Sequence, residues 1–241
     1  MKSIFAIILL FSIYSSYSSV SKKLDKGFKT LSKNKPNKAL QKFNDALKEN
    51  PDCAICLYGV ALIVSDSTNS HYDLERSYEL IHRAIDLMAE NTQIQMPDFT
   101  DAHIDPHELD KLASNIEHQQ YDHLAINDLL AFSIYVEKHH NAVTLNVFKE
   151  HRDKLSYLQA LEENTIDGYN TFIKKYPHAS DNMNARIRRN KLAFDKAKNS
   201  KDVHALDEFI KQHPKAQQTS EAKLIRNQWA YIAFLEKEKE L

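Results

Sequence analysis

The segment FIKKYPHA, residues 172–179, returns almost unchanged as FIKQHPKA, residues 209–216. The two segments agree at five of eight positions and start 37 residues apart. If the sequence around them repeats at the same offset, the chain is built from copies of one structural unit and not from a single irregular fold.

The repeat extends well beyond these two segments. At the 37-residue offset, matching or similar residues pair along the second and third copies: Ala160 with Ala197, Ile166 with Val203, Tyr169 with Leu206, Ala185 with Ala222, and Arg189 with Arg226. A first copy lies one period earlier, with residues 135–138 aligned with 172–175, Ala142 with Ala179, and Arg152 with Arg189. Three copies at one period are typical of a repeat protein.

Each copy is predicted to be a short helix followed by a long one. Asp128, Thr165 and Asp202 occupy the same place, each just before an apolar residue. A side-chain oxygen there accepts hydrogen bonds from the free N–H groups of a helix's first turn, so we expect these residues to be N-caps. Pro177 and Pro214 then end the short helices, because proline disfavours helical geometry in the residue before it. The first copy has His140-Asn141 there instead, which leaves its turn unmarked.

The repeated apolar positions predict a joint between neighbouring hairpins. Phe172 and Phe209 are expected to be buried there. The long helix is expected to pass through a small residue, Ala185 or Ala222, and to reach an aromatic residue at Tyr157, Phe194 or Tyr231. A single hairpin cannot bury such a face alone, and stacking the copies supplies the missing surface.

The front of the chain shows a related pattern. Its first unit has a small residue, an alanine, an aromatic residue and a closing proline at helical-hairpin spacing: Gly27, Ala39, Phe43, Ala46 and Pro51. A second, degenerate unit follows, with residues 65–72 as an insertion: Leu57, Ala61, Ser77, Ile81 and Ala84. Both units have about the 34-residue length of a tetratricopeptide repeat.

These motifs carry a family resemblance. Residues 20–90 resemble tetratricopeptide repeats, and residues 123–234 resemble the related helical-hairpin repeats of bacterial cell-envelope proteins. The resemblance implies an all-α, right-handed α-solenoid of stacked helical hairpins whose concave face binds a protein or peptide partner. It implies no catalytic residue and no cofactor. On this interpretation residues 19–91 are N-terminal repeats, 92–122 a connecting segment with a helix, and 123–241 the three C-terminal repeats.

The first residues have the pattern of an export signal. Lys2 is followed by an apolar stretch at residues 4–14 and a small-residue segment at 15–19. Ser16-Tyr17-Ser18 fits a small-x-small cleavage site, so residues 1–18 are interpreted as a signal peptide. The apolar stretch is about half the roughly 20 residues that a spanning helix needs. We expect a periplasmic or secreted protein, with an uncleaved membrane anchor as the alternative.

Composition narrows the classes of partner. The 32 Lys and Arg residues balance 33 Asp and Glu residues, so no overall field attracts nucleic acid. With three glycines and no phosphate-loop, dinucleotide or hydrolase motif, the sequence predicts neither an enzyme nor a small-molecule substrate.

Two short motifs nevertheless raise an alternative function. Cys53 and Cys56 form a Cys-x-x-Cys pair at a predicted helix start, which suits either a redox site or a structural disulfide. In the histidine-rich middle segment, His103 and His107 stand four residues apart among carboxylates, as in some metal sites. Asp105-Pro106 reads equally well as a helix start, with Asp105 as the N-cap. A redox or metal-dependent site is therefore the alternative to a binding scaffold.

The candidate partner-binding residues are exposed cations and one aromatic residue. Arg186, Arg188 and Arg189 form a basic cluster on a long helix and suit an acidic partner. On the short helices, Lys174, Lys211 and a partly accessible Tyr169 are expected to border a groove, together with Asp167 and Asn170. The alternatives are that the charges only solvate the surface or pair between repeats, and that Tyr169 belongs to the core.

Overall fold

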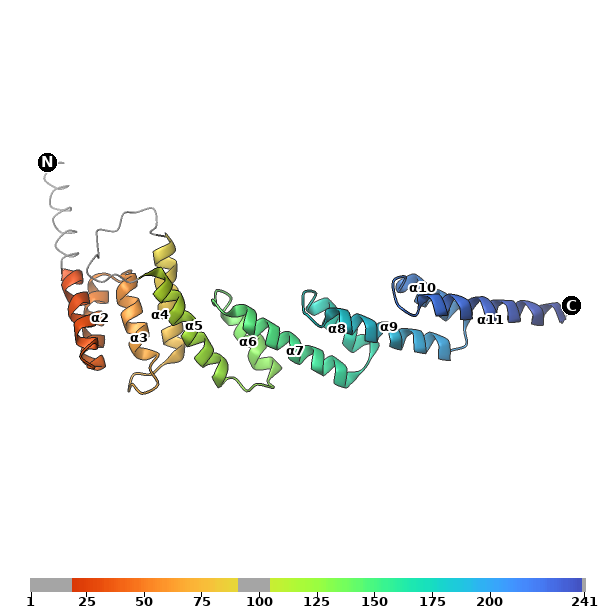
Figure 1. Ribbon diagram of the computed structural model, residues 1–241, viewed down its shortest axis with the longest axis horizontal. Helices are drawn as coiled ribbons and strands as arrows, with labels where there is room; N and C mark the ends of the chain where they lie inside the picture. The colour runs from red at the N-terminus through yellow and green to blue at the C-terminus, as the bar shows by residue number, and fades with distance from the viewer. Residues whose placement is uncertain (1–18, 91–104, 240–241) are drawn as a thin grey trace, which may run out of the picture. The chain divides into compact units, whose positions relative to one another are not determined.

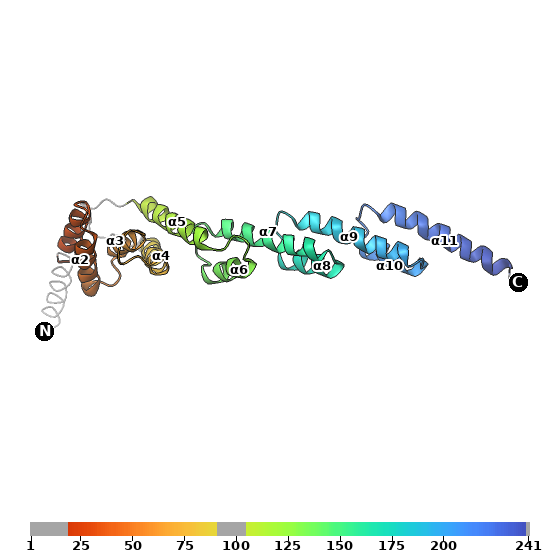
Figure 2. The same cartoon turned by 90° about the horizontal axis from the view of Figure 1, so that it is seen from below.

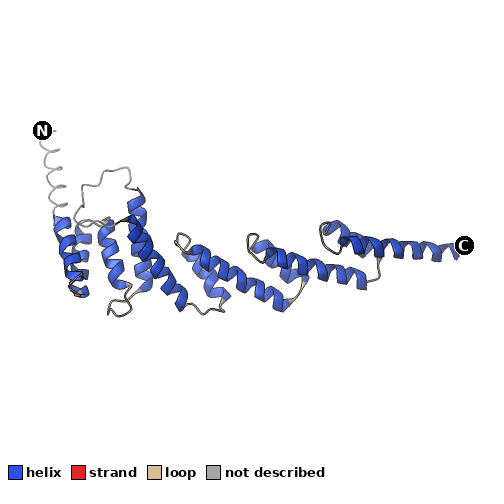
Figure 3. Cartoon of the chain, viewed as in Figure 1, coloured by secondary structure: helices blue, strands red, loops and turns tan. Residues whose placement is uncertain are grey.

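The computed structural model describes residues 19–90 and 105–239 and is all-helical there (Figure 3). Residues 19–31 form the first helix. The others, labelled in Figure 1, are α2 Pro36–Glu49, α3 Ala54–Val64, α4 Leu74–Glu90, α5 Pro106–His123, α6 Leu129–Lys138, α7 Leu145–Glu163, α8 Ile166–Lys175, α9 Asn182–Asn199, α10 Val203–Gln212 and α11 Thr219–Lys239. None of these described helices combines the length and apolar character needed to cross a lipid bilayer.

The chain divides into two compact units, which are described separately. The first unit ends at Ile126 and also includes Val136–Leu145, and the second comprises Asn127–Tyr135 and Asn146–Leu241. In both units helices pack against their neighbours in sequence, as in consecutive hairpins. In the second unit, for example, α10 lies against both α9 and α11 (Figure 2).

The core of the first unit is organised around the Phe43 ring. A Cβ atom added to Gly27 would lie 2.5 Å from Phe43 Cε1, and one added to Gly59 would lie 2.7 Å from its Cζ atom. Both distances are too short for any side chain, so the two glycines let the helix at residues 19–31 and α3 close on the ring. The expected core residues of both N-terminal units are buried: Ala39, Phe43, Ala46, Leu57, Ala61, Ser77, Ile81 and Ala84.

The helices from α6 to α11 confirm the 37-residue repeat. The short helices α6, α8 and α10 begin at residues 129, 166 and 203, and each is ten residues long. The long helices α7, α9 and α11 begin at residues 145, 182 and 219, again 37 residues apart. The helices therefore repeat at the same 37-residue offset as the sequence in all three copies.

Local hydrogen bonds explain these boundaries. Thr165 Oγ1 accepts from Gly168 N at 2.9 Å, Asp202 Oδ1 from His204 N at 2.9 Å, and Asp128 Oδ1 from Ala131 N at 2.9 Å. The three predicted N-caps are thus confirmed. The predicted stops are also confirmed, since α8 and α10 end two residues before Pro177 and Pro214.

The predicted joints are present in the second unit. Phe172 and Phe209 are 2% and 4% exposed. Their rings lie 5.4 Å from Tyr157 and 5.5 Å from Phe194 of the preceding long helices, measured between centroids. Small residues allow close helix contact, and both Ala185 and Ala222 are fully buried.

One residue in this pattern differs from its counterparts in the other copies. Tyr231, the third aromatic of the series, is 63% exposed. Tyr157 and Phe194 are buried because the next short helix lies on them, whereas no described element lies on the corresponding face of α11. Tyr231 thus continues the aromatic series in the sequence but, unlike its counterparts, is not buried.

Candidate functional site

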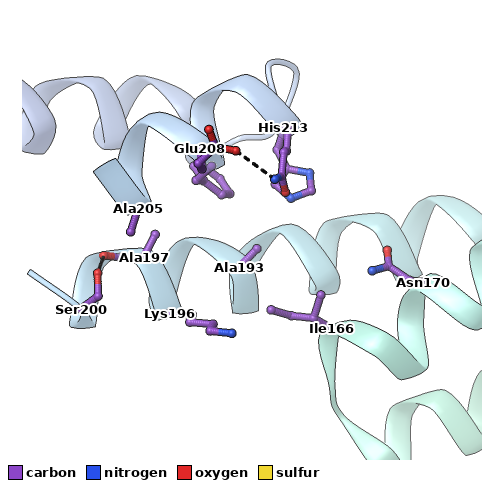
Figure 4. A pocket seen from close by; sticks show the side chains of 11 residues that line it. Ile166, Asn170, Ala193, Lys196, Ala197, Ser200, Ala205, Glu208 and His213 are labelled. Carbon is purple, nitrogen blue, oxygen red and sulfur yellow. Dashed lines mark hydrogen bonds between the residues drawn. The ribbon is translucent and has the colours of Figure 1, made fainter. Parts of the chain in front are cut away.

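One hollow on the second unit is a groove bordered by short helices. It has a volume of about 410 Å³, with α9 between α8 and α10 along its length (Figure 4). We call it the short-helix groove, and its lining residues include Ile166, Asn170, Ala193, Lys196, Glu208 and His213. Its charges are mixed, and Glu208 already accepts a hydrogen bond from Gln212 Nε2 at 3.3 Å. The groove therefore has no strong preference for one sign of charge.

The second hollow has a distinct chemical character. It has a volume of about 520 Å³, lies between α9 and the turn that joins α10 to α11, and is named here the basic hollow. Its lining residues are Met183, Arg186, Ile187, Arg189, Asn190, Gln212, His213, Pro214, Lys215, Ala216, Gln217 and Gln218. Three are permanent cations and none is acidic. Met183 and Ile187 add apolar surface, being 66% and 38% exposed.

A hydrogen bond to a buried asparagine holds Arg186 at the edge of this hollow. Arg186 Nε donates to Asn182 Oδ1 at 2.8 Å. Asn182 is itself buried, and its Nδ2 donates to the backbone oxygens of Tyr176 at 2.9 Å and Ile173 at 3.2 Å. A guanidinium held in this way loses less conformational freedom when it meets an anion than a free side chain does.

Arg189 is fixed by its neighbours as well. Its Nε and Nη2 atoms donate to Asn190 Oδ1 at 3.1 and 2.8 Å, and Nη1 donates to Asn170 Oδ1 at 3.2 Å. Burial and the charge of Arg186 lower the pKa of Arg189. Burial and the charge of Arg189 likewise lower the pKa of His213, so this imidazole is mainly neutral at pH 7. A carboxylate in the hollow would relieve the repulsion between the two arginines.

The arginines that recur at the repeat period also act at the joints. Arg226 Nη1 donates to Asp207 Oδ1 at 2.7 Å, which is the counterpart of the bond from Arg189 to Asn170. The Arg152 guanidinium lies 4.9 Å above the Tyr176 ring, and Arg189 Nη2 lies 3.5 Å from His213 Nδ1 at the equivalent place. Arg189 therefore contributes to packing as well as to the basic hollow.

The remaining predicted partner-binding residues lie elsewhere. Lys174, Lys211 and Arg188 are exposed and line neither hollow. A hydrogen bond with Tyr157 raises the pKa of Arg188 further, so it remains a cation. The structure thus brings together Arg186 and Arg189 but not the other candidates.

Tyr169 is not the accessible anchor that we considered. It is fully buried, and its hydroxyl donates to Asn164 Oδ1 at 3.1 Å. Its position in the repeat is shared by Phe132 and Leu206, which are also fully buried, because this side of each short helix faces the joint. The core alternative for Tyr169 is the one that the structure matches.

The two cysteines form a disulfide at the start of α3. Cys53 is the N-cap, and its Sγ accepts from Cys56 N at 3.2 Å. Both residues are buried in the same core as Phe43, and Cys56 is 0% exposed. Thiol–disulfide exchange requires access to a sulfur atom, so this burial does not favour a redox site.

The histidine-rich segment is only partly described. His103 lies outside the described residues, whereas His107 lies in the first turn of α5. Asp105 is the N-cap of this helix, as predicted, and its Oδ1 accepts from His107 N at 3.0 Å. In residues 19–90 and 105–239 no group of three or more His, Cys, Asp and Glu side chains is placed to hold a metal ion.

A buried polar cluster in the first unit was not predicted from the sequence. Glu117, which is 0% exposed, accepts hydrogen bonds from His82 Nε2 at 2.9 Å, Val143 N at 2.9 Å, and Thr144 N and Oγ1, both at 2.6 Å. Burial alone would raise the pKa of Glu117, but these hydrogen bonds outweigh it and lower the pKa. The cluster fastens the 139–144 turn to α4 and α5. The sequence signal was a lone acid among the apolar positions of α5.

Comparison of the chain with protein-family models, curated proteins and solved structures finds no match. Conclusions about function therefore depend on the geometry above.

Proposed function

We propose that this chain is a non-catalytic, exported helical-repeat scaffold that binds a protein or peptide partner in the cell envelope. In this proposal the consecutive hairpins form a right-handed α-solenoid of tetratricopeptide-like repeats, and the signal at residues 1–18 is removed. The observation that supports it best is the basic hollow, whose lining combines Arg186, Arg189 and Lys215 with apolar side chains.

The chemistry of the hollow favours an acidic peptide with apolar side chains. Exposed ion pairs contribute only about 0.2–1 kcal/mol each, so the cations alone do not give a stable complex. Complete burial of a side chain such as Met183 or Ile187 contributes about 1.5–3 kcal/mol. The apolar contacts are therefore expected to supply most of the affinity, while the cations speed association and select an acidic partner.

The binding site can be tested with a defined probe. A fluorescent peptide of alternating Glu and Leu residues is titrated with the full chain, and anisotropy is recorded at low and high salt. We expect saturable binding that weakens with salt. The double variant Arg186→Glu with Lys215→Glu should lose this binding, since both charges are inverted within the hollow.

Two matched variants locate the effect. Lys174→Glu with Lys211→Glu makes the same change of charge on the short helices, and Lys191→Glu with Lys223→Glu makes it at exposed positions outside both hollows. Both should bind like the wild type. Equal loss in all three variants would mean that only net charge matters, and loss in the first control alone would move the site to the short helices.

The natural partner and the export step need separate measurements. Crosslinking of the full chain in the envelope fraction, followed by mass spectrometry, should recover a partner from the wild type but not from the Arg186→Glu and Lys215→Glu variant. For export, mass spectrometry of the native protein should find an N-terminus between residues 16 and 22. Recovery of intact Met1 from the membrane fraction would favour the anchored form.

A further inference from the structure

The last helix of the second unit carries an uncovered apolar surface. Over its C-terminal half, α11 exposes Tyr231 at 63%, Ile232 at 51%, Phe234 at 57% and Leu235 at 40%. In a stack of repeats, an apolar face of this kind is covered by the neighbouring unit. Among the described residues nothing covers this face of α11.

The repeat register shows what covers the equivalent surface elsewhere. Tyr231 corresponds to Tyr157 and Phe194, which are 5% and 4% exposed. Phe234 corresponds to Ala160 and Ala197, at 4% and 6%. In both earlier copies the covering element is the next short helix, which places Phe172 or Phe209 against the aromatic ring.

We propose that Tyr231, Phe234 and Leu235, here called the terminal joint, bind an amphipathic helix of a partner protein. The partner helix presents large apolar side chains at positions i and i+3, as the short helices of this chain do. Each of them has such a pair, buried at its own joint: Phe132 and Tyr135, Tyr169 and Phe172, Leu206 and Phe209. The partner helix thus continues an interface that the second unit already makes twice.

The side chains of the terminal joint indicate how the partner differs from an internal repeat. Lys198 Nζ pairs with Glu221 Oε1 of the following hairpin at 3.0 Å, and the register places Leu235 at the position of Lys198. Phe234 stands where the earlier copies have alanine. The terminal joint is therefore more apolar than the internal joints, which favours a partner helix with an apolar side chain beside Leu235.

A second copy of the chain does not present the i and i+3 side chains of its short helices. Their i and i+3 side chains are between 0% and 6% exposed within their own joints. The exposed face of α11 of a second copy would remain available, and this arrangement is an outcome of the test below. The proposal does not depend on the basic hollow, which lies at the start of α9 and the turn before α11.

The test uses the full chain and a labelled peptide with the sequence of residues 165–179, which spans α8 with its N-cap and its turn. We expect saturable binding, reduced about tenfold or more by Tyr231→Ser, as for an aromatic residue at the centre of an interface. Leu224→Ser is the matched control, because Leu224 is 59% exposed on the same helix and its register equivalent Ile187 is exposed too. It should leave binding unchanged.

A fusion covers the case in which the free peptide is too weakly helical, as isolated helices of this length are. Residues 165–181 replace residues 239–241, so that the added short helix continues the 37-residue register. Hydrogen exchange should then slow around Tyr231, and Tyr231→Ser should remove this protection. Absence of both peptide binding and protection would overturn the proposal, as would equal effects of Tyr231→Ser and Leu224→Ser. A dimer in sedimentation that Tyr231→Ser converts to a monomer would also overturn it, in favour of a contact between two copies of α11.

Discussion

Each of the two units is stabilised by a different kind of internal contact. The second unit makes one aromatic joint repeatedly, with Phe172 and Phe209 at equivalent places. The first unit depends on single contacts that occur once: a phenylalanine enclosed by two glycines, a disulfide, and a buried glutamate with four hydrogen bonds. Stability in the second unit is thus distributed over similar steps, whereas in the first it is concentrated at a few residues.

The largest effect is expected at the repeated joints. Phe172→Ala and Phe209→Ala should each lower the free energy of unfolding of the second unit by about 3–5 kcal/mol, because each leaves a cavity in a small core. Hydrogen exchange read separately for the two units is the appropriate measurement, since a chain of two units need not unfold in one step. The two losses should agree closely, and the first unit should be unaffected.

Leu158→Ala is the matched control for these variants, because this side chain is 47% exposed on α7. Its effect should be within about 0.5 kcal/mol, as at most surface positions. If one phenylalanine proved far more costly than the other, the joints would not be equivalent, and the contrast between the two units would fail.

Periodicity is the reason why the second unit could be predicted from the sequence. Its main features each recur one period away: the caps Thr165 and Asp202, the stop at Pro177 and the buried Phe172. The copies could therefore be compared with one another within a single sequence. Tyr231 shows what periodicity alone does not determine. The burial of an aromatic residue at this repeat position depends on the next short helix in the series.

The candidate site was predicted only in part. Arg186 and Arg189 were singled out as a cluster, but Met183 and Ile187, the large apolar side chains that line the hollow, were not. Apolar side chains on a helix are expected to face the core, and only the packing of the hairpins shows which remain exposed. The Glu117 cluster had no periodic signal, because its hydrogen-bond donors lie on a turn and on another helix, 26–35 residues away in sequence.

The next largest effect should come from that glutamate. Glu117→Gln replaces a carboxylate that only accepts hydrogen bonds by an amide whose NH2 group faces N–H donors. Disrupting a buried, hydrogen-bonded charge in this way is expected to cost the first unit about 3 kcal/mol. Glu108→Gln on the exposed side of the same helix is the control and should change the stability little.

The pH dependence of the same variant distinguishes a lost charge from lost packing. The pKa of Glu117 lies below its usual 4.5 in the folded protein, so its contribution is fully present above pH 4.5 and is lost as the pH falls through the folded value. Wild type and Glu117→Gln should therefore converge in stability below pH 4.5. A constant difference down to low pH would show that the ionised carboxylate is not what stabilises the cluster.

A smaller effect is expected where the first unit encloses Phe43. Gly27→Ala and Gly59→Ala should each lower the free energy of unfolding of the first unit by about 1–2 kcal/mol. Overpacking costs about 1–3 kcal/mol, and the higher helix propensity of alanine offsets up to about 1 kcal/mol of this cost. Thermal unfolding of the first unit checks this. Phe43→Leu in the Gly59→Ala background should recover part of the loss, because a smaller side chain relieves the contact. A stabilising Gly59→Ala would mean that the ring moves freely.

The smallest effect tests whether the two units differ in local structure or only in packing. In the second unit Thr165 caps α8 and accepts a backbone hydrogen bond at 2.9 Å. In the first unit Asp105 caps α5 and accepts one at 3.0 Å. Replacing either by alanine should cost about 1 kcal/mol in its own unit, because a helix-start N–H group loses the same kind of partner in both. Equal losses, measured by hydrogen exchange at the first turn of each helix, would place the difference between the units in their cores. A much larger loss for Thr165→Ala would show instead that the repeated joints depend on the caps that begin each short helix, and that stability in the second unit is set by its turns as much as by its aromatic residues.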